Sequence, residues 1–581
     1  MLRSRSTGHM RSQFQAHIEA DGRGVPVDEV LDEYKERKET LKLYGEEKIS
    51  RREFIRRMGV AGISAATLLA LGSCKSAKIS PQVAPPPPAT DERVVIIGAG
   101  MAGLNCALTL KGKGIIANIY EADHRLGGRI ATHMPGPPPE SGGDHHELGF
   151  ARPTEHGASF ISSEHRTIRK LAQAYGLPLA IVNGGALLEG EDMYVIDGQF
   201  YTPEEAGADW AIAWEGFRQD LRKAPWLPTY DTYTQRGYEL DRINVREWFD
   251  PAHPHSNPIL ANNFGPDSRF AKLCYSSTIA EYGGNVEDMP ALHLLYTLAW
   301  NPKSSLNPLP GTDEYYTIAG GLSQLVYAMA ADIPDQIHRD NELRAITGDF
   351  MGPYTLEFSG GPNVVADRLV LTIPFNILRN LDIDQRILDG MRPEKRLALE
   401  TLPMGTNGKV HIELAHRTWG PGYEREINGA MRTLNGSIYT DPDSVQLVWD
   451  DTAYYEEGPV VLLGFLGGDK GANIGVRGGA FGAANATEVS EFLNAVEFVF
   501  PGTLDAYNGT AMASNWSLNE WSGGAYVSYG LGGYTGYVGA IGLSEGNIFF
   551  AGEHCSTEYQ GYMEGAAESA EAAALEIWRS V

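Results

Sequence analysis

The sequence predicts an α/β fold that contains a Rossmann-like domain, and two stretches near opposite ends of the chain carry this prediction. The apolar, β-branched run 94–97 is followed by a glycine-rich turn, by helical spacing over 104–110 and by a second apolar run, 115–120. Near the C-terminus, the apolar run 548–551 precedes a glycine-entered helical pattern over 561–577. Strand–turn–helix units of this kind build parallel sheets covered by helices.

The composition is that of a globular protein. Of the 581 residues, 43% are hydrophobic and 21% are charged, which excludes a disordered, collagen-like or polytopic membrane protein. The length suggests about two to four domains, or one large interleaved pair. The net charge of -26 argues against sequence-independent nucleic-acid binding, because such a surface repels phosphate. Four cysteines are too few for a disulfide framework.

The first segment, 1–73, is interpreted as an extension followed by an export signal. Arg51 and Arg52 precede a mildly apolar run, 58–71, that is shorter than the ~20 residues needed to span a bilayer. The pattern resembles a bacterial twin-arginine signal. The alternative is an amphipathic helix with one buried face. Residues 1–50 are unusually long for such a signal, so either they have a role of their own or the coding start is assigned too early.

The signal is followed by a possible lipid anchor and a tether. Residues 71–74 resemble a lipobox, in which Cys74 would become the acylated first residue of the mature protein. Residues 74–90 are rich in proline and alanine, which favours an extended, semi-rigid linker. These features predict a periplasmic protein, or one anchored on the outer side of the inner membrane. The alternative is a cysteine of no consequence within the signal.

The glycine-rich turn after the first strand has the layout of a dinucleotide site. Gly98 permits the tight turn, Gly100 allows the backbone to approach a pyrophosphate, and Gly103 lets the helix pack against the strand. The helix N-terminus offers amide donors and partial positive charge to the phosphates. Glu121, at the end of the second strand, is predicted to accept hydrogen bonds from the adenosine ribose. An acidic residue here disfavours a 2′-phosphate and leaves NAD or FAD.

The next motif separates these two cofactors. Residues 125–129 read RLGGR, and this stretch resembles the RxGGR segment of flavoproteins in which Gly128 and Arg129 would support the FAD pyrophosphate. Nicotinamide-binding domains do not need this element. FAD is therefore the predicted cofactor.

From about Arg93 to the C-terminus the chain resembles the flavin-containing monoamine oxidase family. Several motifs in the family's order carry the resemblance, and they are IAGGLSQL from 318, ADRLVLTIPFNIL from 366, GKVHIEL from 408, NWSLNEWSGGAY from 515 and the closing NIFFAGEHCSTEYQGYMEGAAESA from 547. The resemblance implies two interleaved domains, a Rossmann-like FAD domain and an α+β substrate domain. The expected FAD domain comprises 91–165, 316–380 and 500–581, and the expected substrate domain comprises 166–315 and 381–499.

The resemblance also implies roles for individual residues. Tyr526 and Tyr562 match two tyrosines whose rings flank the substrate nitrogen before the flavin, where facing aromatic rings orient an amine and exclude water. Lys409 matches a lysine that holds a water against flavin N5 and assists reoxidation by O2. Glu553 would bind the FAD ribitol or pyrophosphate, and Trp516 would lie near the flavin. For Lys409, the alternating pattern of its strand leaves a solvated polar face as the alternative.

Two departures from the family pattern matter. Members that bind flavin covalently have a cysteine just before the first cage tyrosine, and Ala525 stands there, which predicts noncovalent FAD. Phe160 stands where L-amino-acid oxidases carry an arginine for the substrate carboxylate, so a carboxylate clamp is missing from its usual place and Phe160 is expected to contact the substrate. Arg152 could substitute for that arginine. The balance favours a plain amine.

The predicted reaction is oxidation of an amine by FAD. The amine α-carbon gives a hydride to flavin N5, the imine is hydrolysed to an aldehyde or ketone plus ammonia, and O2 is reduced to hydrogen peroxide. Three alternatives stay open: an L-amino-acid oxidase, a dehydrogenase that uses an exported cytochrome, and a flavin-binding scaffold without catalysis. A carotenoid-desaturase or protoporphyrinogen-type oxidase is disfavoured by the SGGAY and GYMEGA motifs. A homodimer is expected, and the histidines at 145 and 146 are interpreted as a loop without metal.

Overall fold

The structure, a computed structural model, describes residues 92–135, 149–182, 190–309, 313–455 and 457–581. Contacts divide the chain into two units, and one of them includes all of the described residues. The predicted export signal, tether and lipidated Cys74 lie outside the described residues, as do His145 and His146. Within the described ranges, no helix is long and apolar enough to span a membrane.

A five-stranded parallel sheet forms the first layer. In spatial order its strands are β24 (Ile548–Phe550), β13 (Arg368–Leu371), β1 (Val94–Ile97), β2 (Ala117–Tyr120) and β9 (Ile337–His338). The central strand β1 is buried along its whole length, as its β-branched run predicted. The sheet thus joins segments from both ends of the described chain.

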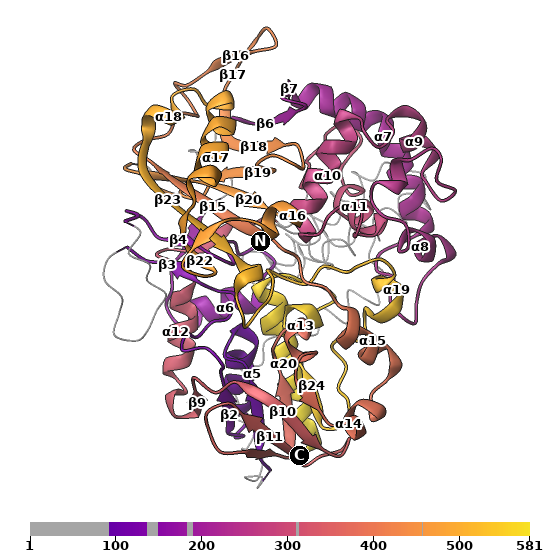
Figure 1. The fold of residues 1–581 in the computed structure, drawn as a ribbon, viewed down its shortest axis with the longest axis vertical. Coiled ribbons are helices and arrows are strands. Elements are labelled where there is room, and N and C mark those ends of the chain that lie inside the picture. Colours follow the sequence, from indigo (N-terminus) through magenta and orange to yellow (C-terminus); the bar gives the residue numbers. More distant parts are fainter. Residues whose placement is uncertain (1–91, 136–148, 183–189, 310–312, 456) are drawn as a thin grey trace, which may run out of the picture. The chain divides into compact units, whose positions relative to one another are not determined.

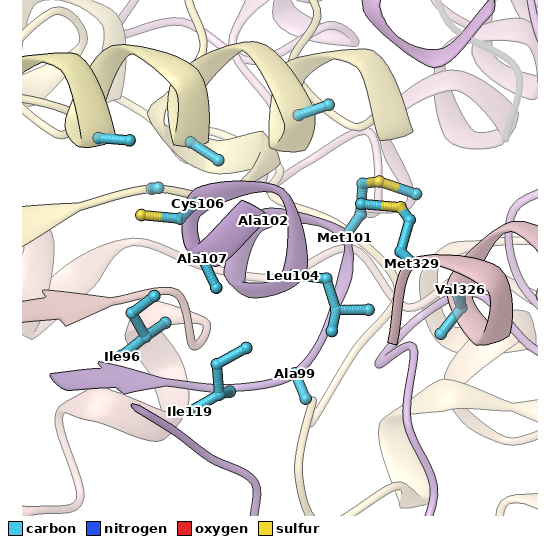
Figure 2. Packing of buried hydrophobic residues seen from close by; sticks show 14 of the residues in the cluster. Ile96, Ala99, Met101, Ala102, Leu104, Cys106, Ala107, Ile119, Val326 and Met329 are labelled. Atoms are coloured by element: carbon cyan, nitrogen blue, oxygen red, sulfur yellow. The ribbon is translucent and has the colours of Figure 1, made fainter. Parts of the chain in front are cut away.

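Helices α5 (Met101–Lys111) and α20 (Met563–Ser580) pack against each other beside this sheet (Figure 1). Leu104 and Ala107 of α5 point toward the sheet residues Ile96 and Ile119, and Cys106 points toward α20 (Figure 2). Small side chains on both helices allow this close approach, and the resulting core is fully buried.

A nine-stranded sheet forms the second layer. Its strands, in spatial order, are β21 (Val476–Arg477), β22 (Phe481–Ala484), β23 (Tyr507–Asn515), β15 (Gly408–Leu414), β20 (Val460–Leu466), β19 (Leu447–Asp450), β18 (Leu434–Thr440), β6 (Glu191–Ile196) and β7 (Gln199–Tyr201). The alternation in β15 left a solvated polar face as one reading, but all seven of its residues are buried. The polar face of β15 is buried because other polar segments of the chain pack on it.

Smaller sheets complete the β structure. A four-stranded sheet contains β12 (Val364–Ala366), β11 (Tyr354–Phe358), β10 (Leu343–Gly348) and β14 (Asp382–Ile383). The two-stranded pairs are β3 (Thr132–His133) with β4 (Thr154–Glu155), β5 (Leu179–Ile181) with β8 (Tyr316–Ile318), and β16 (Arg425–Ile427) with β17 (Ala430–Arg432).

The remaining helices connect and cover these sheets, and several begin at side-chain caps. They are α6 (Arg166–Ala174), α7 (Pro203–Lys223), α8 (Gln235–Leu240), α9 (Pro258–Asn263), α10 (Arg269–Tyr282), α11 (Ala291–Leu298), α12 (Ser323–Ala331), α13 (Phe375–Leu378), α14 (Gln385–Gly390), α15 (Pro393–Thr401), α16 (Gly468–Ala472), α17 (Ala486–Val499), α18 (Thr503–Ala506) and α19 (Gly533–Tyr537). In Figure 1, α10 lies beside the nine-stranded sheet, and α11 packs against α10 and α7. The exact division into an FAD and a substrate domain stays a prediction.

Lys395 on α15 is fully buried, and its ammonium donates to the carbonyls of Ile541 and Leu543 and lies 3.5 Å from the Phe550 ring centroid. Desolvation lowers its pKa to about 7, against attraction from Glu545 and Cys555. Because the unfolded chain then binds the proton more tightly, this group's contribution to stability rises with pH between about 7 and 10.

Lys395→Met is therefore expected to have a higher unfolding free energy than the parent protein. The difference should be largest near pH 6 and should shrink as the pH rises to 10. Chemical unfolding at several pH values measures the difference in unfolding free energy. Lys223→Met, at an exposed position, is the control. An advantage independent of pH would show that Lys395 keeps an ordinary pKa.

Candidate cofactor and substrate site

A cavity of about 350 Å³ lies at the carboxyl ends of the parallel strands, where open α/β sheets bind their ligands. Its volume is in the range typical of small-molecule sites. The lining comes from the turn after β1, the end of β2, the RLGGR turn, and six later segments between residues 158 and 566. The predicted residues Gly98, Gly100, Glu121, Gly128, Arg129, Glu553 and Tyr562 all line it.

The three glycines of the first turn have different physical roles. Gly98 has φ +101°, and a Cβ there would lie 2.6 Å from Thr372 Oγ1. A Cβ at Gly103 would lie 1.9 Å from the carbonyl oxygen of Gly98, so this glycine lets α5 pack on the turn. At Gly100 the nearest atom to a Cβ is 3.8 Å away, and the open space belongs to the cavity. This is the arrangement expected for a backbone that a pyrophosphate approaches.

Glu121 is buried at the end of β2, and its carboxylate accepts from the backbone N–H groups of Ala99 (2.6 Å) and Asp123 (2.9 Å). Desolvation raises its pKa, and these two hydrogen bonds oppose the rise. Each oxygen keeps a further lone pair for a ligand hydroxyl. The carboxylate therefore fixes the glycine turn, while its predicted contact with the ribose stays a prediction.

Arg125 and the two glycines after it shape the next wall. Gly127 and Gly128 both have positive φ, +107° and +56°. The guanidinium of Arg125 donates to the carbonyls of Gly128 (2.6 Å) and Ile130 (3.0 Å), which locks the turn. The sequence predicted no role for Arg125 beyond its place in the RLGGR motif. Its spacing from the two glycines could have indicated that it stabilises their turn.

Glu553 connects three segments that are far apart in the sequence. One carboxylate oxygen accepts from Arg129 Nη1 (2.7 Å) and from the N–H of Val527 (3.0 Å). The other accepts from the N–H of Gly561 (2.7 Å). Val527 directly follows Tyr526 and Gly561 directly precedes Tyr562, so a single carboxylate fixes the backbone beside both predicted cage tyrosines.

The two tyrosines have different surroundings. Tyr562 lines the cavity, its hydroxyl lies 3.4 Å from Glu314 Oε1, and its ring meets His165 edge-on at 5.0 Å. Burial lowers the pKa of His165 to about 3, which keeps this imidazole neutral. Tyr526 is fully buried and its hydroxyl donates to the carbonyl of Ala280 (2.9 Å). The facing arrangement of the two rings stays a prediction.

Lys409 is buried in β15 and its ammonium donates to the carbonyls of Glu155 and Gly157 (both 2.8 Å) and to Ser159 Oγ (2.6 Å). Desolvation lowers its pKa, opposed by Asp451 and Glu155. Burial likewise raises the pKa of the Glu155 carboxyl. Among the described residues, all three donors of the ammonium thus have protein acceptors, which the family resemblance did not predict.

Trp516 and Phe160 belong to the same apolar cluster. The indole of Trp516 donates to the carbonyl of His156 (2.9 Å) and its ring leaves no room for a Cβ at Gly157. Phe160 packs against Trp449, with ring centroids 5.9 Å apart, in an apolar cluster that contains Tyr526. Neither side chain belongs to the cavity lining, so their predicted contacts with flavin and substrate stay predictions.

One further part of the lining and one contact near it were missed. Asn341–Arg344, which run from the turn after β9 into the start of β10, line the cavity, and the N–H of Asn341 donates to the Glu121 carbonyl (2.9 Å). Asn376 of α13 donates to the carbonyl of Ser522 (2.9 Å) and so joins two motifs that were recognised but given no residue roles. Asn341–Arg344 carry no motif that could have revealed them.

The described part of the chain contains no cluster of three or more side chains suited to a metal. Cys106 and Cys274 are buried, and desolvation raises the pKa of the Cys106 thiol to about 12. The residue before Tyr526 is Ala525, which has no nucleophile for a flavin.

The parallel sheet, glycine turn and acidic strand end define a Rossmann-type dinucleotide-binding protein. Residues 101–577 match the model of the flavin-containing amine oxidoreductases, and the chain belongs to that family. The chain is therefore an FAD-dependent amine oxidoreductase with the two-domain fold of its relatives.

Similar proteins cover most of the chain. A nicotine dehydrogenase of Pseudomonas putida is 22% identical over 91% of this chain and 97% of its own length. A flavin-dependent L-tryptophan oxidase of Lentzea aerocolonigenes is 27% identical over 84% of this chain and 98% of its own. The solved structure of cyclohexylamine oxidase from Brevibacterium oxydans has a TM-score of 0.66 at 19% identity, covering 84% and 99% of the two chains. At this sequence identity, the likeness to cyclohexylamine oxidase shows a shared fold and nothing more.

Proposed function

We propose that the protein oxidises plain amines with noncovalently bound FAD and passes the electrons to O2, which yields hydrogen peroxide. The observation that carries the substrate class is Phe160, which lies in an apolar aromatic cluster at the position where a carboxylate-binding arginine is expected. Arg152, the candidate substitute, donates to the Glu457 carbonyl and stacks 4.2 Å from the Tyr455 ring centroid. Both observations favour a substrate without a carboxylate.

The described residues fit FAD. The open space at Gly100 and the N-terminus of α5 would receive the pyrophosphate, and Glu121 would hold the ribose. Bound FAD supplies a hydride acceptor. Around it, Tyr562 and the apolar cluster of Tyr526 and Phe160 would orient a neutral amine and exclude water. Ala525 leaves no thiol for a covalent link, which supports noncovalent binding.

An anaerobic substrate screen tests the substrate class. Each L-amino acid is compared with its decarboxylated amine by following the bleaching of bound flavin. We expect the amines to reduce the flavin faster, with a rate that rises about tenfold per pH unit below the pKa of the bound amine, because only the neutral amine has a free electron pair. Faster reduction by the amino acids would favour the L-amino-acid oxidase alternative, and a flat alkaline profile would contradict the neutral-amine requirement.

The electron acceptor needs its own experiment, since one relative is named a dehydrogenase. The buried positive charge of Lys409 favours O2, because a cation stabilises the negative charge that develops as O2 is reduced. Mixing the reduced protein with O2 in a stopped-flow instrument measures this step. Reoxidation much slower than turnover with an exported cytochrome would support the dehydrogenase alternative.

We further propose export by the twin-arginine route, a lipid anchor on Cys74 and a homodimer. The sequence before residue 91 supports the first two. If Cys74 bears a lipid anchor, Cys74→Ala should be released from the membrane fraction. Cell fractionation of the parent and of the variant tests this. Sedimentation of the purified protein tests the dimer.

A further inference from the structure

Two buried acidic residues lie beside the two predicted cage tyrosines. The hydroxyl of Tyr562 lies 3.4 Å from Glu314 Oε1, in a buried contact. The hydroxyl of Tyr526 donates to the carbonyl of Ala280 (2.9 Å). The next residue of α10 is Glu281, which is only 1% exposed. One acid therefore contacts a cage tyrosine, and the other directly follows the residue that the second tyrosine contacts.

Tyr439 of β18 relates the two acids to each other. Its ring belongs to the apolar cluster that contains Tyr526, and α10, which bears Glu281, packs against β18. Burial raises the pKa of the Tyr439 hydroxyl, and the charges of Glu314 and Glu281 are among those that raise it further. Both carboxyl groups therefore lie within electrostatic reach of one hydroxyl, at the aromatic cluster that would orient the amine.

The backbone holds Glu314 in a conformation that favours glycine. Its φ is +42°, and non-glycine residues with such angles persist where their surroundings fix them, often at ligand sites. The N–H of Glu314 donates to Ser162 Oγ (3.3 Å). Beside it, the N–H of Ser163 donates to the Asp313 carboxylate (2.8 Å). Glu314 is thus fixed against the segment that also bears Phe160, the residue at the expected place of the carboxylate-binding arginine.

A carboxylate at this place favours positive charge in the substrate. Burial of a carboxylate costs free energy unless hydrogen bonds or a cation compensate it. The nitrogen that is oxidised has to be neutral, because only then does it have a free electron pair. A second nitrogen on the same molecule takes no part in the reaction and stays protonated, so the carboxylates and the surrounding aromatic rings attract it. A substrate carboxylate would instead be repelled.

We propose that Glu281 and Glu314 determine substrate specificity by binding a second cationic group, so that the preferred substrates are diamines with an aliphatic chain between the two nitrogens. This inference rests on the proposed amine oxidation and narrows its substrate class. The neutral nitrogen lies between Tyr526 and Tyr562, where it is oxidised. The protonated nitrogen binds the two acids and leaves unchanged in the product.

Anaerobic flavin reduction by matched amines tests the proposal. Each α,ω-diaminoalkane is compared with the n-alkylamine of the same carbon number, and the measured value is the limiting reduction rate divided by the dissociation constant. We expect the best diamine to exceed its monoamine by at least about tenfold. Glu314→Gln and Glu281→Gln keep the size of the side chain and remove its charge. Each should lower the diamine value at least about tenfold and leave the monoamine value within about threefold.

Glu413→Gln is the matched control. Glu413 is equally buried, and its carboxylate accepts from the N–H of Ala151 (2.7 Å) and from the side chain of Asn508 (2.6 Å). This variant should keep the parent's ratio of diamine to monoamine. A ratio near one in the parent, or a ratio that neither Glu314→Gln nor Glu281→Gln lowers, would overturn the proposal.

Binding without turnover separates this inference from the proposed reaction. A diamine with both nitrogens on tertiary carbons has no α-hydrogen to transfer, and its binding is followed by the change in flavin absorbance. We expect it to bind the parent at least about tenfold more tightly than Glu314→Gln, while the tert-alkyl monoamine of the same skeleton binds both alike. If no amine reduces the flavin but this preference is present, the proposed reaction is wrong and the charge recognition stands. If amines reduce the flavin and neither probe distinguishes the variants, the charge recognition is wrong and the reaction stands.

Discussion

Glu553→Ala is expected to lose FAD and to be destabilised by at least about 3 kcal/mol, because the substitution removes the carboxylate partner of Arg129 and the acceptor of two buried hydrogen bonds, from the N–H groups of Val527 and Gly561. The carboxylate holds the backbone beside both predicted cage tyrosines, so the cavity walls should separate. Flavin content after gel filtration and chemical unfolding measure the two effects. Glu553→Gln, which keeps one acceptor oxygen and the shape, should lose less of both.

Glu545→Ala provides the comparison. Glu545 is equally buried and paired with Arg392 (2.5 Å), but neither residue lines the cavity. This variant should be destabilised and yet retain stoichiometric FAD below its unfolding transition. Full flavin occupancy in Glu553→Ala would show that the three-way contact is dispensable for the cofactor.

Alanine substitutions at Gly100 and Gly103 are expected to separate cofactor binding from folding. Gly100 has φ −77°, which any residue can adopt, and a Cβ there meets no atom closer than 3.8 Å. Gly100→Ala should therefore keep the stability of the apoprotein while its methyl group weakens FAD binding by at least about tenfold. Gly103→Ala drives a methyl group to 1.9 Å from a backbone oxygen and should cost about 3 kcal/mol or more of stability.

Titration of apoprotein with FAD, followed by flavin fluorescence, and chemical unfolding of the apoprotein measure both properties. Gly207→Ala in α7 is the control, since a Cβ there meets nothing within 4 Å and alanine favours a helix. If Gly100→Ala binds FAD like the parent, the pyrophosphate does not approach this glycine.

The parts of the fold that follow local sequence rules were predictable. The strand Val94–Ile97 lies where its apolar run predicted it, and α5 and α20 begin and end within a few residues of their expected positions. The surroundings of β15 were not predictable from its alternating pattern. Period two identifies two faces, but only the tertiary packing of Thr154–Glu155 and the segment after it determines that the polar face is buried.

The residues of the candidate site likewise divide into those that a local motif predicted and those that only tertiary packing brings together. Gly98, Gly100, Gly103 and Glu121 lie close together in the sequence, so one motif predicted their arrangement at the turn. The partners of Glu553 come from residues 129, 527 and 561, and no local spacing relates these positions. Ser159 likewise looks like an ordinary serine until β15 brings Lys409 against it.

The order in which the chain supplies the strands of the parallel sheet also determines when the cavity can form during synthesis. Strand β13 pairs with both β1 and β24, and α5 packs against α20, so the first nucleotide-binding turn lacks these neighbours until residues 548–580 have been synthesised. A nascent chain cannot close the cavity around FAD before then, and a protein truncated before residue 548 lacks both β24 and Glu553, which follows that strand. Cofactor loading thus depends on residues 548–580, and flavin content reports whether a molecule contains them.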